Sequence, residues 1–215
     1  MLNIKKFVVN PNQECTYVVS DETREAVIID CGVFYPSERI RLLEYIAQEQ
    51  LHPTRLLLTH AHHDHLFGND LIKEHFGLLP EVHEDDRNIF LHILPLRIKE
   101  LFGEKYPYPI PQPEYYLKSG EIIPFGSHQL RVMPTPGHTP GSVVFYCWEE
   151  KVAFTGDTLF SMGIGRTDLP GGDYKQMAES LDYILRRLPN EVVIHPGHGG
   201  KSSIGHERVC NPYLV

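Results

Sequence analysis

The sequence concentrates metal-binding side chains in one short segment. Residues 60–65 hold four histidines and one aspartate. Imidazole binds zinc, iron, copper or nickel, whereas carboxylate oxygen suits harder ions, so the mixed set allows more than one metal. His60 and His62 point the same way from an extended backbone, while Asp64 and His65 begin the next element and point elsewhere. One loop can therefore serve two metals; the alternative is a solvated histidine-rich turn.

Three later turns each carry one residue of the same chemical kind. His138 lies between two Gly/Pro turns, Asp157 follows an apolar run, and His198 lies in the glycine-rich stretch after Ile194. The ends of strands are where α/β sheets place their binding sites. Each turn taken singly is typical of an ordinary loop, but the four segments together predict one shared site.

The elements around these turns predict a layered α/β domain. Residues 106–116 carry proline at every second position from 107 to 113, which excludes a helix and a central strand. This segment either walls a substrate pocket or forms a stiff connection. Strands are expected at 2–9, 15–20, 26–30, 55–59, 121–125, 128–133, 142–148, 151–155 and 191–194, and helices at 38–50, 64–76, 174–187 and, broken at Pro95, 84–102.

Composition limits the class of protein. The 215 residues are 41% hydrophobic and 22% charged, with a net charge of −8, which disfavours nucleic acid and anionic membranes as partners. The N-terminus shows no secretory signal, and no apolar run has the length of a membrane span. The four cysteines are far apart and are expected to be reduced thiols. We therefore expect one cytoplasmic domain over residues 1–215.

Four motifs in this order resemble the metallo-β-lactamase superfamily: H-x-H-x-D-H at 60–65, GHTPGS at 137–142, GDTLF at 156–160 and PGHG at 196–199. The resemblance implies an αββα sandwich with two metals at one edge. It also implies the ligands: His60, His62 and His138 for the first metal, Asp64, His65 and His198 for the second, and Asp157 bridging both, as does a water or hydroxide. His195 is a rival to His198, and the motif favours His198.

The segment 157–172 is similar to the glyoxalase II group, the hydroxyacylglutathione hydrolases, and to the related persulfide dioxygenases. In that group a G-x-G-[K/R] turn contacts glutathione, and residues 163–166 match it, which makes Arg166 the substrate-binding candidate. The short tail after Gly199 implies that the helical glutathione-binding domain is absent, as in short glyoxalase II-like hydrolases. Zinc β-lactamases of similar sequence usually carry cysteine at the position of Asp157, so antibiotic hydrolysis is not expected as the main role.

The resemblance therefore implies a hydrolase of a glutathione-type thioester, similar to S-lactoylglutathione, that uses a metal-bridging hydroxide. Asp64 is expected to orient this nucleophile as the catalytic residue. The cofactors are expected to be two divalent ions, zinc first, with iron or manganese as alternatives. Two other functions remain open: a persulfide dioxygenase with one iron, and a metal-binding module without catalysis. The expected partner is a small-molecule thioester, and the oligomeric state is left open.

Overall fold

Two six-stranded sheets form the centre of the molecule. A computed structural model describes residues 1–214. The first sheet has the order β1 (Asn3–Val9), β2 (Glu14–Ser20), β3 (Glu25–Ile29), β4 (His52–Leu57), β5 (Pro80–His83), β6 (Tyr116–Leu117). The second has the order β14 (Ser202–Ser203), β13 (Val193–Pro196), β10 (Val152–Gly156), β9 (Val143–Cys147), β8 (His128–Pro134), β7 (Ile122–Phe125). A small ribbon pairs β11 (Leu159–Phe160) with β12 (Gly163–Ile164).

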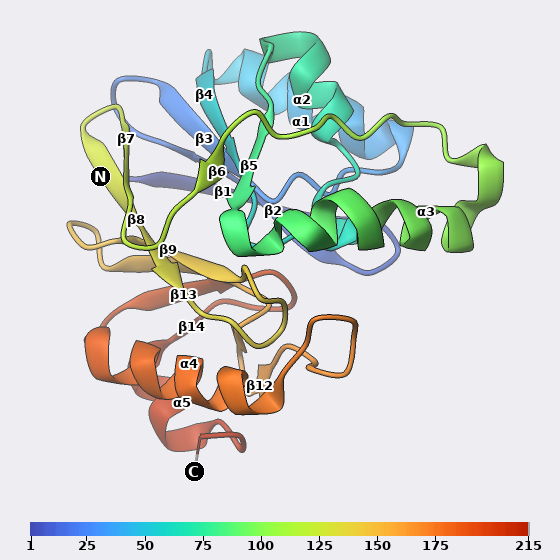
Figure 1. Cartoon of the computed structure of the whole chain (residues 1–215). Helices are drawn as coiled ribbons and strands as arrows, with labels where there is room; N and C mark the ends of the chain where they lie inside the picture. The colour runs from blue at the N-terminus through green and yellow to red at the C-terminus, as the bar shows by residue number, and fades with distance from the viewer. Residues whose placement is uncertain (215) are drawn as a thin grey trace.

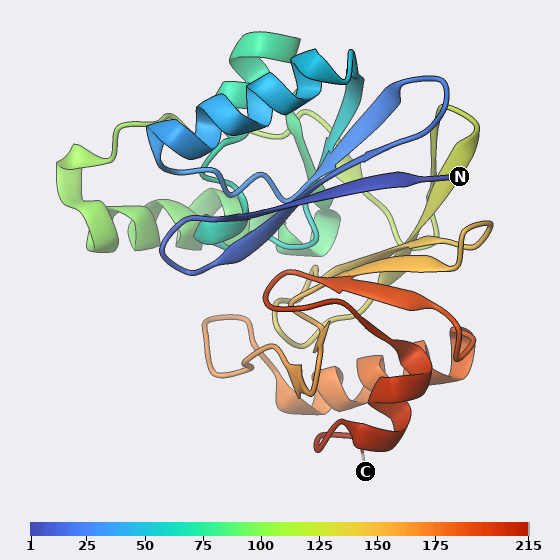
Figure 2. The ribbon, with the colours of Figure 1, turned by 180° about the vertical axis from the view of Figure 1, so that it is seen from behind.

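Helices cover the outer faces of both sheets, as Figures 1 and 2 show from opposite sides. The first sheet carries α1 (Pro36–Gln48) and α2 (Asn69–Phe76), and the second carries α4 (Tyr174–Arg187) and α5 (Ile204–Cys210). Helix α3 (Leu94–Phe102) projects beside the first sheet, preceded by a π-helical segment, η3 (Ile89–Ile93). Among residues 1–214, no helix combines the length and apolar character that crossing a membrane requires.

The main core lies between the two sheets. Tyr17 and Val19 of β2 pack there against Phe145 of β9 and Phe154 of β10, all of them buried. Two further apolar clusters join each sheet to its own helices. These layers confirm the expected αββα sandwich. The expected single domain stays a prediction, and its last residue, Val215, lies outside the described residues.

The helix expected at 64–76 begins later than predicted. His63–His65 forms one 3-10 turn, η1, and α2 starts only at Asn69. At Gly68 the chain packs tightly on the loop after β3: the Gly68 amide donates to the Cys31 carbonyl at 2.8 Å, and a Cβ there would collide with Val33. The prediction was wrong at this end because tertiary contact, not helix propensity, fixes the chain between the loop and α2.

Pro95 does not break the helix expected at 84–102. It occupies the first turn of α3, directly after the π-helical segment. Just before it, the amide of Leu94 donates to the carbonyl of Ile89, five residues back. The helix thus continues by changing from π to α geometry. Helix α5 and the short strands β5, β6, β11, β12 and β14 were not anticipated from the sequence.

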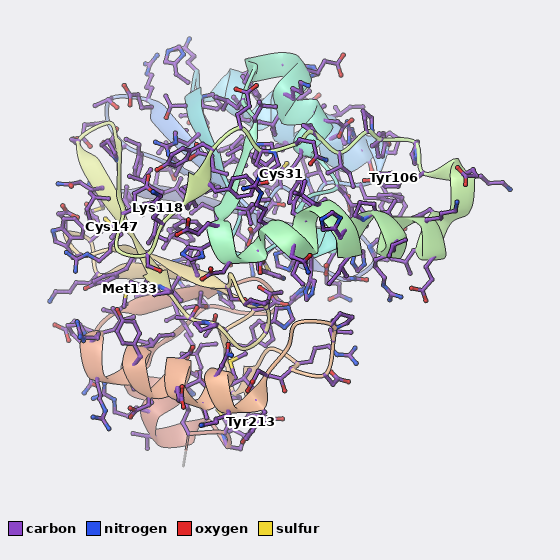
Figure 3. The ribbon with its side chains drawn as sticks, viewed as in Figure 1. Cys31, Tyr106, Lys118, Met133, Cys147 and Tyr213 are labelled. Atoms are coloured by element: carbon purple, nitrogen blue, oxygen red, sulfur yellow. The ribbon has the colours of Figure 1, made fainter. Side chains whose placement is uncertain are left out.

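The proline-rich segment 106–116 forms neither helix nor central strand, as expected; only Tyr116 at its end joins the edge strand β6. Two of its tyrosines, Tyr106 and Tyr108, pack on helices instead. The Tyr106 ring lies 5.3 Å from Phe102 of α3, and the Arg39 guanidinium of α1 lies 4.0 Å from the ring of Tyr108. Figure 3 shows Tyr106 at the outer end of α3. The segment therefore connects α3 to the helical layer.

The β7–β8 turn is tied to the end of β2 by a buried charged pair. His128 shares one hydrogen bond with Asp21 at 2.9 Å and another with Glu150 at 3.0 Å, through its two ring nitrogens. Burial lowers the pKa of His128, but these two hydrogen bonds outweigh it and raise the pKa overall. Burial likewise raises the pKa of Asp21, and its hydrogen bonds to Thr23, Ser127 and His128 lower it by more.

These shifts predict where in pH the pair stabilises the fold. The contribution of His128 is present below its unfolded pKa of about 6.5 and is lost as pH rises through its raised folded pKa. The contribution of Asp21 is present above about pH 4 and is lost as pH falls through its lowered folded pKa. We expect His128→Gln to lower the melting temperature most between about pH 4 and 6.5. Thermal unfolding from acid to alkaline pH measures this, and a difference that does not vary with pH would contradict it.

Candidate metal centre

The four turns singled out in the sequence meet at one edge of the two sheets. The histidine loop follows β4, residues 135–142 join β8 to β9, Asp157 follows β10, and His198 follows β13. The carboxyl ends of parallel strands lie at one edge, and β10 and β13 are such a pair. The topology therefore gathers the side chains from positions far apart in the chain.

Seven predicted ligands form overlapping groups. Within each group every ligand atom lies within 4.8 Å of the others. These groups are His60, His62 and His138; His60, His65 and Asp157; and Asp64, His65 and His198. The structure thus brings together both predicted trios, and Asp157 appears beside members of each.

Asp157 lies between the two trios. Its Oδ2 is 3.4 Å from Nε2 of His138 and 3.6 Å from Nε2 of His198. Its Oδ1 is 3.5 Å from Nε2 of His65. One carboxylate therefore reaches a member of the first trio with one oxygen and members of the second trio with both.

In most of these imidazole rings one nitrogen forms a hydrogen bond with the protein, and the other nitrogen points to the shared centre. Nδ1 of His138 bonds the Arg166 carbonyl at 2.7 Å, Nδ1 of His65 bonds Asp30 at 3.1 Å, and Nδ1 of His198 bonds the Asn12 carbonyl at 3.1 Å. Such outer hydrogen bonds fix the orientation of metal-binding imidazoles. His62 is the exception: its Nδ1 lies 2.8 Å from Nε2 of His138, so Nδ1 is its inward atom.

The residues present fit metal ions. Three inward atoms, Nε2 of His60, Nε2 of His65 and Oδ1 of Asp157, are buried without a hydrogen-bond partner. Buried polar atoms without partners are costly, and coordination to a cation satisfies them. Burial lowers the pKa of His60 well below its usual value, with neighbouring imidazoles acting the same way, and the neutral ring is the form that binds metal.

Two glycines allow this close approach. A Cβ on Gly197 would collide with the Asp157 carboxylate and the His65 ring, and one on Gly165 would collide with the Asp157 carbonyl. Gly197, the first glycine of the PGHG motif, and Gly165, the second glycine of the G-x-G-R turn, are therefore needed because a side chain there would displace Asp157.

Sequence reasoning missed three residues that hold the ligand loops. Asp30 accepts from the Thr59 amide and hydroxyl, both at 2.7 Å, and faces His65. Asn12 donates to Oδ2 of Asp64 at 2.9 Å. Asp86 links the two histidine loops, accepting from the amides of residues 61 and 141 at 2.8 and 2.6 Å. Burial raises the pKa of Asp86 to about 6 despite these bonds. Only Asp30 had a signal, as a carboxylate ending a buried strand.

Two further histidines differ from the predicted seven. The half-buried ring of His195, the rival to His198, packs against Tyr17 and Phe154 of the core between the sheets at 5.5 and 5.3 Å. Burial lowers its pKa to about 4. His63 lies beside the centre but is in none of the ligand groups found among residues 1–214. Neither residue shares the inward geometry of the predicted seven.

A cleft of about 870 Å³ opens over the predicted ligands. Its lining includes His62, Asp64 and Asp157, together with the candidate Arg166. Within residues 1–214, no residue of segment 106–116 lines this cleft. The suggestion that this segment walls the substrate pocket is therefore wrong for this cleft, because Tyr106 and Tyr108 pack on helices.

Comparison with known proteins follows this geometry. The sequence pattern of the metallo-beta-lactamase superfamily matches residues 9–198. The chain belongs to that superfamily. It is similar to the hydroxyacylglutathione hydrolase GloC of Haemophilus influenzae, with 36% identity over 214 residues that cover 99% of this chain and 98% of that protein. This similarity is consistent with a glyoxalase II-like member of the superfamily.

Solved structures of the superfamily share the fold. The B3 metallo-beta-lactamase BLEG-1 matches with a TM-score of 0.88 and 34% identity, covering 99% of this chain and all of that one. TTHA1623 in a di-iron-bound form matches with a TM-score of 0.84 and 34% identity over 98% of this chain and all of that one. ETHE1 from Myxococcus xanthus matches with a TM-score of 0.78 and 26% identity over 98% of this chain and 83% of that one.

Proposed function

We propose that this superfamily member is a binuclear metallohydrolase that cleaves a glutathione-type thioester. The observation that carries the proposal is Asp157, whose two carboxylate oxygens lie near imidazole nitrogens of both trios. His60, His62 and His138 would hold one divalent ion and Asp64, His65 and His198 the other, with Asp157 shared between them. Zinc is the first candidate; iron or manganese are alternatives, and the di-iron form of TTHA1623 supports the former.

When bound, such a metal pair lowers the pKa of a water molecule towards neutrality and polarises the substrate carbonyl. The chain supplies the rest of the chemistry. Asp64, held by Asn12, orients the attacking water and receives its proton. The leaving thiol has a pKa of about 8.5, so it departs as thiolate and needs no strong general acid.

The thioester substrate is supported by the similarity to GloC and by the turn at residues 163–166. The turn also has a structural role, because the Arg166 carbonyl accepts a hydrogen bond from Nδ1 of His138. The Arg166 side chain is 61% exposed, pairs with the exposed Asp168 and lines the cleft, so an anionic group of the substrate can reach it. On these grounds we propose that small-molecule thioesters are the partners of this protein.

The test is metal content per chain after purification without added metal, with S-lactoylglutathione hydrolysis measured on the same sample. About two equivalents with thioester turnover is the expected result. Metal binding without turnover of any thioester, ester or persulfide would replace the proposal by a non-catalytic module. Nitrocefin hydrolysis, measured in parallel because of the likeness to BLEG-1, is expected to be far slower than thioester hydrolysis.

A second candidate is a persulfide dioxygenase with one iron at the first trio. The likeness to ETHE1 favours it, as does the Gly-Arg-Thr-Asp run at residues 165–168. About one equivalent of iron, with oxygen uptake only when glutathione persulfide is supplied, would decide for this reaction.

A further inference from the structure

The cleft over the candidate metal centre has two walls from different halves of the fold. One wall comes from η3 and α3 and includes Ile93, Leu96 and Arg97. The other comes from β11, β12 and the chain after them and includes Phe160 and Arg166. In Figure 1, α3 lies above the loop between β12 and α4. A ligand in the cleft therefore meets an arginine on each side.

Both arginines are paired, but weakly. Arg97 donates to Glu100 at 2.7 Å, and their side chains are 44% and 68% exposed. Arg166 donates to Asp168 through two nitrogens, at 2.7 and 2.8 Å. Exposed ion pairs of this kind contribute little free energy, so a substrate carboxylate is able to take over either guanidinium.

The pair on α3 has a particular chemical complement. Arg97 and Glu100 lie one helical turn apart, and both line the cleft. A cation and an anion at that spacing match the α-carboxylate and α-ammonium that an amino-acid head group carries on one carbon. Arg97 also lies near the predicted metal centre, because it lines the same cleft as His62 and Asp64. If the head group of a substrate binds there, the rest of the substrate extends over the predicted metal-binding residues.

We propose that Arg97 and Glu100 bind the amino-acid head group of a peptide-thiol carrier, whose other end carries the carboxylate for Arg166, the substrate-binding candidate that the family resemblance already implies. Glutathione has this pattern: one zwitterionic head, one further carboxylate and a thiol between them. Because the protein carries a net charge of −8, an anionic substrate needs such local cations. The inference rests on the proposed thioester hydrolysis and adds a recognition site for the carrier.

The experiment compares S-lactoylglutathione with S-lactoyl-N-acetylcysteamine, which has the same acyl group on an uncharged carrier. Arg97→Gln is expected to lower kcat/KM for the glutathione thioester about tenfold more than for the uncharged one, through KM. Lys99→Gln is the matched control, because Lys99 is an exposed, paired cation of the same helix that does not line the cleft. It is expected to leave the ratio at the wild-type value.

The variant Glu100→Gln tests whether Glu100 binds the substrate ammonium or only competes with the substrate for Arg97. If Glu100 binds the ammonium, the variant raises KM for S-lactoylglutathione about threefold. A lower KM would overturn the head-group assignment, because it would mean that Glu100 only competes with the substrate for Arg97. Wild-type protein that prefers neither thioester, with no change of ratio in Arg97→Gln, would also overturn it. Failure to hydrolyse either compound would instead contradict the proposed function itself.

Discussion

Asp157→Ala is expected to lower thioester turnover by at least about a thousandfold and to lower bound metal from two equivalents to one or fewer. The reason is geometric: the carboxylate of Asp157 has oxygens near members of both trios. The fold itself is expected to survive. Within residues 1–214, Oδ1 of Asp157 has no hydrogen-bond partner, so the loss of this oxygen breaks no hydrogen bond of the fold.

Metal analysis, turnover and thermal unfolding in chelator measure the three parts of this prediction. Asp182→Ala, which removes an exposed carboxylate of α4, is the control for a general effect of lost charge. Two metals and normal turnover in Asp157→Ala would show that Asp157 does not bridge. A protein that fails to fold even in chelator would show that the carboxylate has a structural part.

Asp30→Ala is expected to produce the largest loss of stability, about 3–5 kcal/mol. Asp30 is 2% exposed and accepts from the amide and the hydroxyl of Thr59 as well as from His65. Alanine leaves these buried donors unpaired. The Asp30 backbone also has φ of 53°, a left-handed conformation that alanine tolerates less well than aspartate.

Urea unfolding in chelator measures this loss without a contribution from bound metal. Asp30→Asn is the graded control, because asparagine keeps one acceptor oxygen and tolerates the same backbone conformation. Its loss is expected to be about half as large. In the asparagine variant, affinity for the second metal should fall by about 10- to 100-fold, since the orientation of His65 depends on Asp30. A stability loss below about 1 kcal/mol in Asp30→Ala would contradict the assigned role.

The candidate ligands were predictable because their information is local. Each one lies in a short motif at the end of an apolar strand, and the order of the motifs points to one superfamily. The αββα layers followed from the same pattern of strands and helices. The seven predicted ligands all come together in the structure.

The sequence by itself thus determined which side chains can form the metal centre, because the ability to bind metal depends on residue type and on a position at the end of a strand. Tertiary structure decided what holds and surrounds them. Asp30 and Asp86 act through buried hydrogen bonds to loops distant in sequence. No local pattern marks this role for Asp86, and the place of Asp30 at the end of a buried strand does not show which loop it holds. Gly68 sets where α2 begins by packing on Val33. Arg97 reaches the cleft only because α3 projects over it, and the position of a helix relative to a distant loop depends on packing that residue type and spacing do not encode.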